Sequence, residues 1–137
     1  MGSSNEMAVR QAADAFYGAL NALFKGDVAA MKDVWSHHDD VVYMGPGGSI
    51  KVGWDKVFKD WESQAARKLG GKVMPKDVHF TVGEQIAVMY ALESGANTNI
   101  DGKTKEVAIR VTNLFRKEGD EWKVIGHHTD RLAGIKG

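Results

Sequence analysis

The chain has 137 residues, of which 43% are hydrophobic, and this suits one compact domain. Its 18 basic residues balance its 18 acidic ones, so charge gives no support for nucleic acid as a partner. The absence of cysteine excludes disulfides and thiolate catalysis and fits a reducing compartment. No apolar run approaches the roughly 20 residues needed to cross a bilayer. We therefore expect a cytoplasmic protein that binds neither nucleic acid nor membranes.

Helical periodicity dominates the first half of the chain. Apolar residues at i, i+3, i+4 and i+7 predict a long amphipathic helix over 6–25, and an apolar stripe predicts a third helix over roughly 54–69. Between them, Asp27 is placed to cap a short second helix that runs through about Trp35. Glycines follow the first and third of these segments, where helices commonly end. The first half is therefore predicted to be mostly helical.

After the third helix the periodicity changes from that of helices to that of strands. The sequence predicts a short strand at 39–45 and then four longer ones at 77–82, 85–100, 105–117 and 122–132. The dipeptide "DG" at 101–102 is typical of a hairpin turn. Helices followed by an antiparallel meander indicate an α+β fold, with the helices packed on one face of the sheet.

The order of these elements, together with three segments, carries a family resemblance. "ALNALFKGDVAAMKDVWSHHDDVVYMGPGG", "VGWDKVFKDW" and "GDEWKVIGHHTD" resemble the SnoaL-like branch of the NTF2-like (cystatin-like cone) superfamily. The resemblance covers residues 8–132, between an N-terminal tail (1–7) and a C-terminal tail (133–137). It implies a cone in which three N-terminal helices pack in a strongly curved, mostly antiparallel sheet with an apolar pocket at its open end. Members of the superfamily are often homodimers, and they include both enzymes and binding or assembly modules.

One enzyme of that superfamily, ketosteroid isomerase, uses a carboxylate base and an oxyanion hole made by a tyrosine and a protonated acid. Matching the motifs puts the base position at Gly45, the acid position at Thr112 and the tyrosine position at Phe16. None of these residues can take the corresponding role. The sequence therefore speaks against that isomerase mechanism.

Two histidine pairs stand out as candidate acid–base groups, "HHDD" at 37–40 and "HHTD" near the end of the chain. Neighbours in a strand point to opposite faces, so His127 and His128 cannot both line one pocket unless a bulge intervenes. In a regular strand His128 shares a face with Trp122 and Val124, and it matches the histidine of the family's closing strand. We therefore predict that His128 faces the pocket and acts in catalysis.

Arg110 is the second predicted catalytic residue, because it lies within the apolar strand "VAIRVTNLF". A pocket arginine could hold an anionic or carbonyl group, and an arginine at a sheet edge or a dimer face is equally compatible. The predicted ligand-binding side chains are mostly aromatic, and a purely structural core role is the alternative for each: Tyr17, Tyr43, Trp54, Phe58, Trp61, Tyr90 and Thr112.

The histidine pairs do not have the spacing of metal ligands, so we predict no metal site and no cofactor. His37 and His38 follow the second helix, where the helix dipole favours them.

Two functions remain open from the sequence. The first is a pocket for a small apolar or aromatic molecule, with lyase, isomerase or cyclase chemistry on a carbonyl compound. The second is a non-catalytic, dimeric binding or assembly module. Both faces of the strand over 86–92 are apolar, which favours a homodimer in either case.

Overall fold

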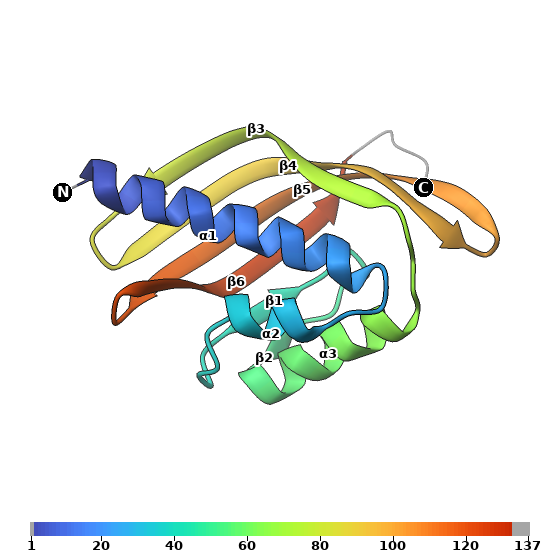
Figure 1. Ribbon diagram of the computed structural model, residues 1–137, viewed down its shortest axis with the longest axis horizontal. Coiled ribbons are helices and arrows are strands. Elements are labelled where there is room, and N and C mark those ends of the chain that lie inside the picture. The colour runs from blue at the N-terminus through green and yellow to red at the C-terminus, as the bar shows by residue number, and fades with distance from the viewer. Residues whose placement is uncertain (1, 133–137) are drawn as a thin grey trace.

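The computed structural model describes residues 2–132, which form three helices and six strands (Figure 1). The helices are α1 (Gly2–Leu23), α2 (Ala29–Val34) and α3 (Trp54–Ala66), and the strands are β1 (Val42–Met44), β2 (Lys51–Val52), β3 (Lys72–Val82), β4 (Ile86–Ile100), β5 (Lys103–Glu118) and β6 (Glu121–Arg131). Among the described residues, no helix has the length and apolar character needed to span a membrane.

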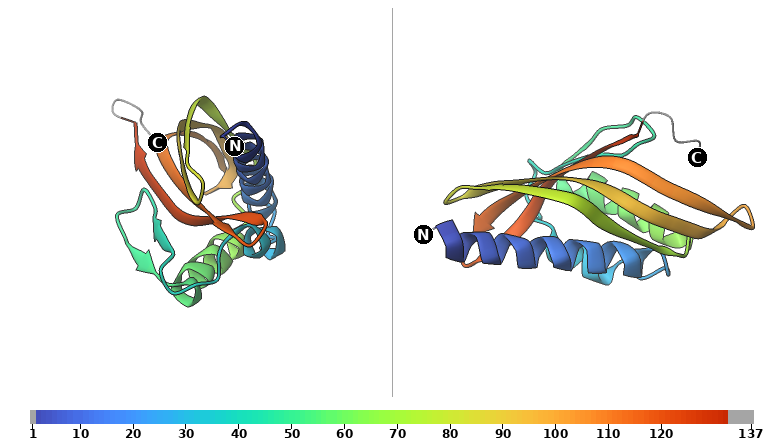
Figure 2. Two further views of the ribbon diagram at one scale, coloured as in Figure 1. Left: turned by 90° about the vertical axis from the view of Figure 1, so that its left-hand side faces the viewer. Right: turned by 90° about the horizontal axis from the view of Figure 1, so that it is seen from above.

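The strands form one sheet in the order β2-β1-β6-β5-β4-β3. All neighbours are antiparallel except β1 and β6, which run parallel. The long strands curl, and α1 lies along the open side of the curl while α3 lies near its base (Figure 2). The predicted α+β fold, with helices packed in a curved and mostly antiparallel sheet, is confirmed.

The helix boundaries differ slightly from those predicted. α1 begins at Gly2, so it runs through most of the segment that was predicted as an N-terminal tail (1–7). The second helix begins beside Asp27, whose Oδ1 accepts a hydrogen bond from the Ala29 N–H at 3.0 Å. The predicted C-terminal tail (133–137) lies outside the described residues.

The core lies between the helices and the concave face of the sheet. Large helical or loop side chains such as Phe16, Trp35 and Trp61 fill it, each at most 1% exposed. β4 contributes the small residues Ala87 and Ala91, together with Met89, to this face. Its bulkier residues point outward, which corrects the prediction that Tyr90 lines the pocket.

A β-bulge in β6 decides which of its residues face the core. Leu114 pairs with Gly126 and Phe115 pairs with Val124, so Ile125 is an extra residue with no partner on β5. An extra residue reverses the alternation of side chains beyond it. Up to the bulge, Trp122 and Val124 are buried, and after the bulge it is His127 and Thr129 that are buried.

The bulge explains why the sequence-based register of β6 is wrong. The prediction assumed a regular strand in which His128 shares a face with Val124. In the structure His127 points into the core and His128 is exposed on the convex face. Every assignment that relied on His128 pointing inward moves to the other face of the sheet.

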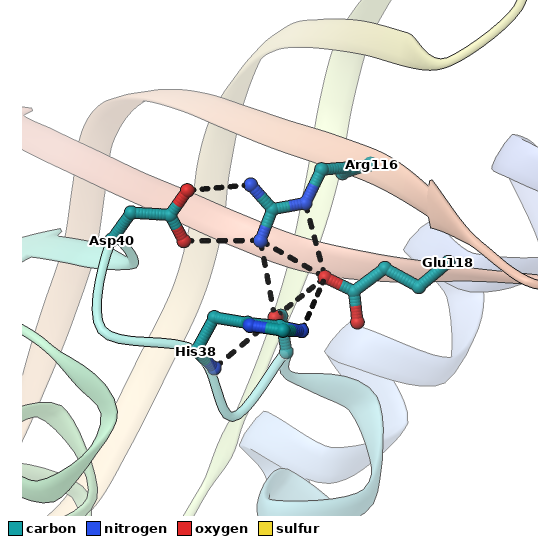
Figure 3. A network of polar contacts seen from close by, with 5 residues as sticks. His38, Asp40, Arg116 and Glu118 are labelled. Atoms are coloured by element: carbon teal, nitrogen blue, oxygen red, sulfur yellow. Dashed lines mark hydrogen bonds and ion pairs between the residues drawn. The ribbon is translucent and has the colours of Figure 1, made fainter.

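A polar network attaches the segment between α2 and β1 to the far end of β5 (Figure 3). The Arg116 guanidinium donates two hydrogen bonds to the Asp40 carboxylate, at 2.6 and 3.0 Å, and one to Glu118 at 3.0 Å. The Ser36 hydroxyl also donates to Glu118, at 2.7 Å. The hydrogen bond from Arg116 lowers the pKa of Asp40. The network holds the residues that lead into β1, the strand that carries Tyr43.

We expect Arg116→Met to lower the free energy of unfolding near neutral pH by about 1 kcal/mol, because the network is partly exposed and screened by solvent. A lowered carboxyl pKa contributes stability above the ordinary pKa that is lost as pH falls. The difference from the wild type should therefore shrink below about pH 4. Urea unfolding across pH measures it, with Lys103→Met, an exposed position on the same strand, as control. An equal loss of stability in the control variant would contradict the role of the network.

A buried acid–base site in the cone

A cavity of about 500 Å³ opens between α3 and the concave face of the sheet. Its apolar wall combines residues from α1 and the turn after it, from α3, and from the strands β1, β3 and β5: Leu20, Phe24, Tyr43, Trp61, Val73, Val107 and Ile109. Glu93, His127, Gln64 and Thr129 are among its polar lining residues. Arg67, Lys105 and Arg131 also line it, and all three are exposed to solvent. The cavity is thus apolar with a few polar groups inside, as is typical of small-molecule sites.

Glu93 is a buried carboxyl group inside this apolar wall. It lies on β4, on the same face as Met89 and Ala91, and is 3% exposed. Its Oε2 accepts a hydrogen bond from the Tyr17 hydroxyl at 2.8 Å. Burial raises the pKa of Glu93 to about 7, and the hydrogen bond from Tyr17 opposes this only in part. Glu93 can therefore both accept and release a proton near neutral pH.

A chain of hydrogen bonds runs from Glu93 behind the cavity wall. Asn113 on β5 donates from Nδ2 to the Tyr17 oxygen at 3.2 Å, and its Oδ1 lies 2.5 Å from Nδ1 of His127. An amide oxygen only accepts, so the hydrogen of this last bond belongs to Nδ1 of His127. The chain therefore connects α1, β4, β5 and β6 through four buried side chains.

His127 is held in an aromatic cage. Its ring stacks on Tyr43 with centroids 5.6 Å apart and planes inclined by 8°, and the rings of Phe16 and Trp61 lie at 4.9 and 5.9 Å. Burial and, secondarily, the nearby His128 lower the pKa of His127 to about 3. The ring is therefore neutral at physiological pH, with Nε2 as an acceptor.

Tyr43 also contributes a polar group to the cavity wall. Its oxygen accepts a hydrogen bond from Gln64 Nε2 at 2.8 Å, which leaves its own hydrogen for another acceptor. A Cβ built on Gly45 would lie 2.8 Å from this oxygen, so the glycine leaves the space that the hydroxyl occupies. Together Glu93 and Tyr43 give the cavity one base and one hydrogen-bond donor.

The structure brings only some of the predicted ligand-binding residues to the cavity. Tyr43 and Trp61 line it, and Tyr17 lies behind the wall in contact with Glu93. Trp54 and Phe58 are not among its lining residues and stack on each other, with centroids 5.1 Å apart. Their neighbour there is His37, whose ring stacks on Trp54 at 4.3 Å and whose Nε2–H donates to the carbonyl of Lys32 at the end of α2.

The remaining predicted site residues lie together on the convex face. His128 pairs with Thr112, which pairs with Tyr90, and all three flank a shallow depression there. Arg110 forms a two-pronged ion pair with Asp130, at 2.8 and 2.6 Å. The placement of His128, Arg110, Tyr90 and Thr112 in the cone pocket is therefore wrong. The bulge in β6 accounts for His128 and the reversed face of β4 for Tyr90, while Arg110 and Thr112 lie on the outward face of β5, whose inward residues include Val111 and Asn113.

Three functional candidates escaped the sequence analysis: Glu93, Asn113 and His127. Glu93 could have been found, because strict alternation from Ala87 through Met89 and Ala91 leads to an acid on the same apolar face. His127 could not, since nothing in "WKVIGHHTD" distinguishes a bulge at Ile125 from a regular strand. Within residues 2–132, no group of three or more His, Asp or Glu side chains could hold a metal ion.

The buried Glu93 carboxyl should make the free energy of unfolding decrease as pH rises. It ionises near pH 4.5 when unfolded and near pH 7 when folded, so between these values the folded state binds more protons. The shift corresponds to on the order of 3 kcal/mol. His127, whose pKa is lowered, contributes the opposite slope below its ordinary pKa of 6.5.

We expect Glu93→Gln to remove the Glu93 contribution while keeping that of His127. Relative to the wild type, the variant should therefore gain stability between about pH 5 and about pH 8. Urea unfolding at both pH values gives the free energy of unfolding of the variant and of the wild type, and the change in their difference between the two pH values is the measured result. Glu84→Gln makes the same chemical change at an exposed turn position and should follow the wild type. Parallel pH profiles for Glu93→Gln and the wild type would contradict the raised pKa.

Comparisons with known proteins agree with this architecture. A protein from Streptomyces avermitilis, provisionally named a dehydratase of the NTF2-like family, shares 22% identity over 98% of this chain and 100% of its own, with a TM-score of 0.85. A domain from Thiobacillus denitrificans, provisionally named a calcium/calmodulin-dependent protein kinase type II association domain, shares 29% identity over 88% of this chain and 92% of its own, with a TM-score of 0.75.

A third solved structure, from Shewanella frigidimarina and provisionally named a ketosteroid isomerase, shares 19% identity over 88% of this chain and 92% of its own, with a TM-score of 0.70. No curated protein matches the sequence. The SnoaL-like domain matches residues 9–129, which is nearly the whole protein chain. The matched region includes the four residues of the buried hydrogen-bond chain, from Tyr17 to His127. The protein therefore belongs to the SnoaL-like domain family, within the NTF2-like fold.

Proposed function

We propose that the cone cavity binds a small, mainly apolar carbonyl compound and that Glu93 acts as a general base on it, in lyase or isomerase chemistry. The observation that carries this proposal is a buried carboxyl group with one oxygen, Oε1, that has no hydrogen-bond partner among the described residues. The other oxygen is held by Tyr17, which orients the group. A base must be both positioned and accessible, and the cavity provides both conditions.

Proton removal next to a carbonyl group also requires stabilisation of the charge that develops on oxygen. The Tyr43 hydroxyl has a hydrogen to donate, because its accepting position is already used by Gln64. Burial, the larger effect, raises the pKa of Tyr43 to about 12, so the hydroxyl keeps its hydrogen. Tyr43 would then hold the substrate oxygen while Glu93 takes the proton. The pKa of Glu93 near 7 suits such a transfer at neutral pH.

The aromatic rings of the cavity fit an aromatic or other flat substrate. The rings of Trp61 and Tyr43 lie 4.7 Å apart and belong to the same wall. The indole N–H of Trp61 is buried without a hydrogen-bond partner among residues 2–132, so a ligand acceptor could satisfy this donor only if the ring turned toward the cavity. The names of the similar dehydratase and isomerase, both acid–base enzymes, support the same class of reaction.

A thermal-shift screen of aromatic and polyketide-like carbonyl compounds would supply a ligand. With a compound that is also converted, we expect Glu93→Gln to retain binding and to lose turnover by roughly a hundredfold or more, the usual loss for a general base. The matched control is Glu84→Gln, which should turn over at the wild-type rate. Undiminished turnover in Glu93→Gln would remove Glu93 from the mechanism.

A second function, as a dimeric binding or assembly module, is favoured by the convex face of the sheet. Tyr90, Ile86 and Met74 are 52%, 45% and 52% exposed there, which is unusual for apolar side chains on a sheet. The similarity to a kinase association domain points in the same direction. We propose that two copies of the chain pair through this face, whether or not the cavity is catalytic.

Light scattering at micromolar concentration should therefore give twice the chain mass of 15.0 kDa. Tyr90→Asp places a charge at the centre of the proposed interface and should shift the mass toward that of one chain. Lys59→Asp changes an exposed residue of α3 on the opposite side and should leave the dimer intact. A wild-type mass of one chain would overturn the proposed dimer.

A further inference from the structure

Glu93 and His127 line the same cavity from different strands and are connected behind its wall. The connection consists of Tyr17 and Asn113, neither of which lines the cavity. The three hydrogen bonds measure 2.8 Å (Tyr17 to Glu93), 3.2 Å (Asn113 to Tyr17) and 2.5 Å (Asn113 to His127). All four side chains are buried, so water does not compete along the chain.

The direction of every hydrogen bond in this chain follows from the charge on Glu93. An ionised carboxylate only accepts, so Tyr17 must donate to it. The Tyr17 oxygen then accepts from Nδ2 of Asn113, and Oδ1 of Asn113 is left to accept from Nδ1–H of His127. His127 consequently presents a bare Nε2, a hydrogen-bond acceptor.

A protonated Glu93 allows all of these bonds to reverse. Its O–H can donate to Tyr17, and Tyr17 can then donate to Oδ1 of Asn113 once the amide turns over. The Asn113 Nδ2 would then donate to Nδ1 of His127, which places the ring hydrogen on Nε2. Of the contacts in the described residues, the reversal sacrifices only the weak one between Asn113 Nδ2 and the sulfur of Met89, at 3.7 Å.

We infer that Tyr17 and Asn113 are positioning residues that pass the protonation state of Glu93 to His127, so that Nε2 is an acceptor when Glu93 is ionised and a donor when Glu93 is protonated. The proton balance is simple. Glu93 takes up one proton from solvent, and His127 stays neutral while its hydrogen moves from Nδ1 to Nε2 by exchange with water. The inference rests on the proposed function only in assuming that a ligand uses Nε2.

Other titratable groups face the two ends of the chain. Around Glu93 and His127 the cavity is lined by Tyr43 from β1, Asp60 from α3, Arg67 directly after α3, Lys105 and Glu106 from β5, and Arg131 from β6. His128 is the sequence neighbour of His127. Among the described residues none of these forms a hydrogen bond to Glu93 or His127. They can move the midpoint of the change but cannot replace the link through Tyr17.

Two properties keep the His127 ring neutral while Glu93 changes charge. Burial, with a smaller contribution from His128, lowers the pKa of His127 to about 3. The pKa of Glu93 is about 7, well above that value. Over the range in which Glu93 titrates, a change at His127 is therefore a change of tautomer and not of charge. When Glu93 is ionised, Nε2 of His127 accepts and favours ligands with a hydroxyl donor. When Glu93 is protonated, Nε2 donates and favours ligands with a carbonyl or carboxylate acceptor.

The ligand-free protein provides the test. With ¹⁵N-labelled histidine, long-range ¹H–¹⁵N correlation spectra distinguish the two tautomers, and the His127→Asn variant assigns the signals. We expect the Nδ1–H form at about pH 9, the Nε2–H form at about pH 5.5, and a midpoint that coincides with the Glu93 titration followed by its ¹³C carboxyl shift. A wild-type His127 tautomer that stays the same while Glu93 titrates would overturn the inference.

Two Tyr→Phe variants separate transmission from packing. Tyr17→Phe removes the link, and we expect the His127 tautomer to stop responding to pH although Glu93 still titrates. Tyr43→Phe removes a hydroxyl from the ring that stacks on His127 but lies outside the chain, and the response should survive. An unchanged response in Tyr17→Phe would also overturn the inference. Should Tyr17→Phe not fold, the wild-type titration alone decides.

The result is independent of whether Glu93 is a catalytic base. A tautomer that follows Glu93 without any turnover would support the coupling while the proposed reaction fails. A His127 tautomer that does not change with pH, together with a loss of turnover in Glu93→Gln, would support the proposed reaction and contradict the coupling.

Discussion

The extra residue in β6 is the constraint on which the rest of the site depends. β6 pairs with both β5 and β1, so it connects the meander to the short strands beside α3. Its first half must close the core with Trp122 and Val124, and its second half must present His127 and Thr129 to the cavity. A regular strand could not supply both pairs from one face, because their spacing is odd. The bulge at Ile125 resolves this conflict within a continuous sheet.

The buried polar chain places ionisable groups in a protein interior, where burial disfavours their charged forms. A carboxyl group inside an apolar wall destabilises the fold when it is ionised, and a neutral histidine in an aromatic cage gives up its own charged state. Partial compensation comes from the hydrogen bonds of Tyr17 and Asn113, which satisfy the atoms that point away from the cavity. Glu93 and His127 each keep one polar atom without a partner among the described residues and both line the cavity, which is the arrangement expected when a ligand completes the set.

Local patterns in the sequence predict the elements well and the site poorly. The helix over 54–69 and the strand over 85–100 are close to α3 and β4, because helical and alternating periodicities reflect which side chains are buried. Which face of β4 is buried depends on the helices that cover it, and here the small residues face inward. The error at His128 has a different origin, since one unpaired residue in β6 has no signature in composition or spacing. Tyr43 and Trp61 line the cavity, whereas Trp54 and Phe58 of the same helical stripe do not, because periodicity identifies the buried face of a helix but not the part of it that borders a cavity.

Gly45 has a consequence for how this cavity could change over evolution. The motif resemblance noted in the sequence places the base position of ketosteroid isomerase at Gly45, and any side chain at this position would begin 2.8 Å from the Tyr43 oxygen. That separation is closer than a Cβ normally approaches another atom, so an acid at Gly45 would displace the hydroxyl that is hydrogen-bonded to Gln64. A side chain at position 45 and the Tyr43 hydroxyl in its present position therefore exclude each other. A lineage that keeps Tyr43 hydrogen-bonded to Gln64 therefore has to keep glycine at position 45.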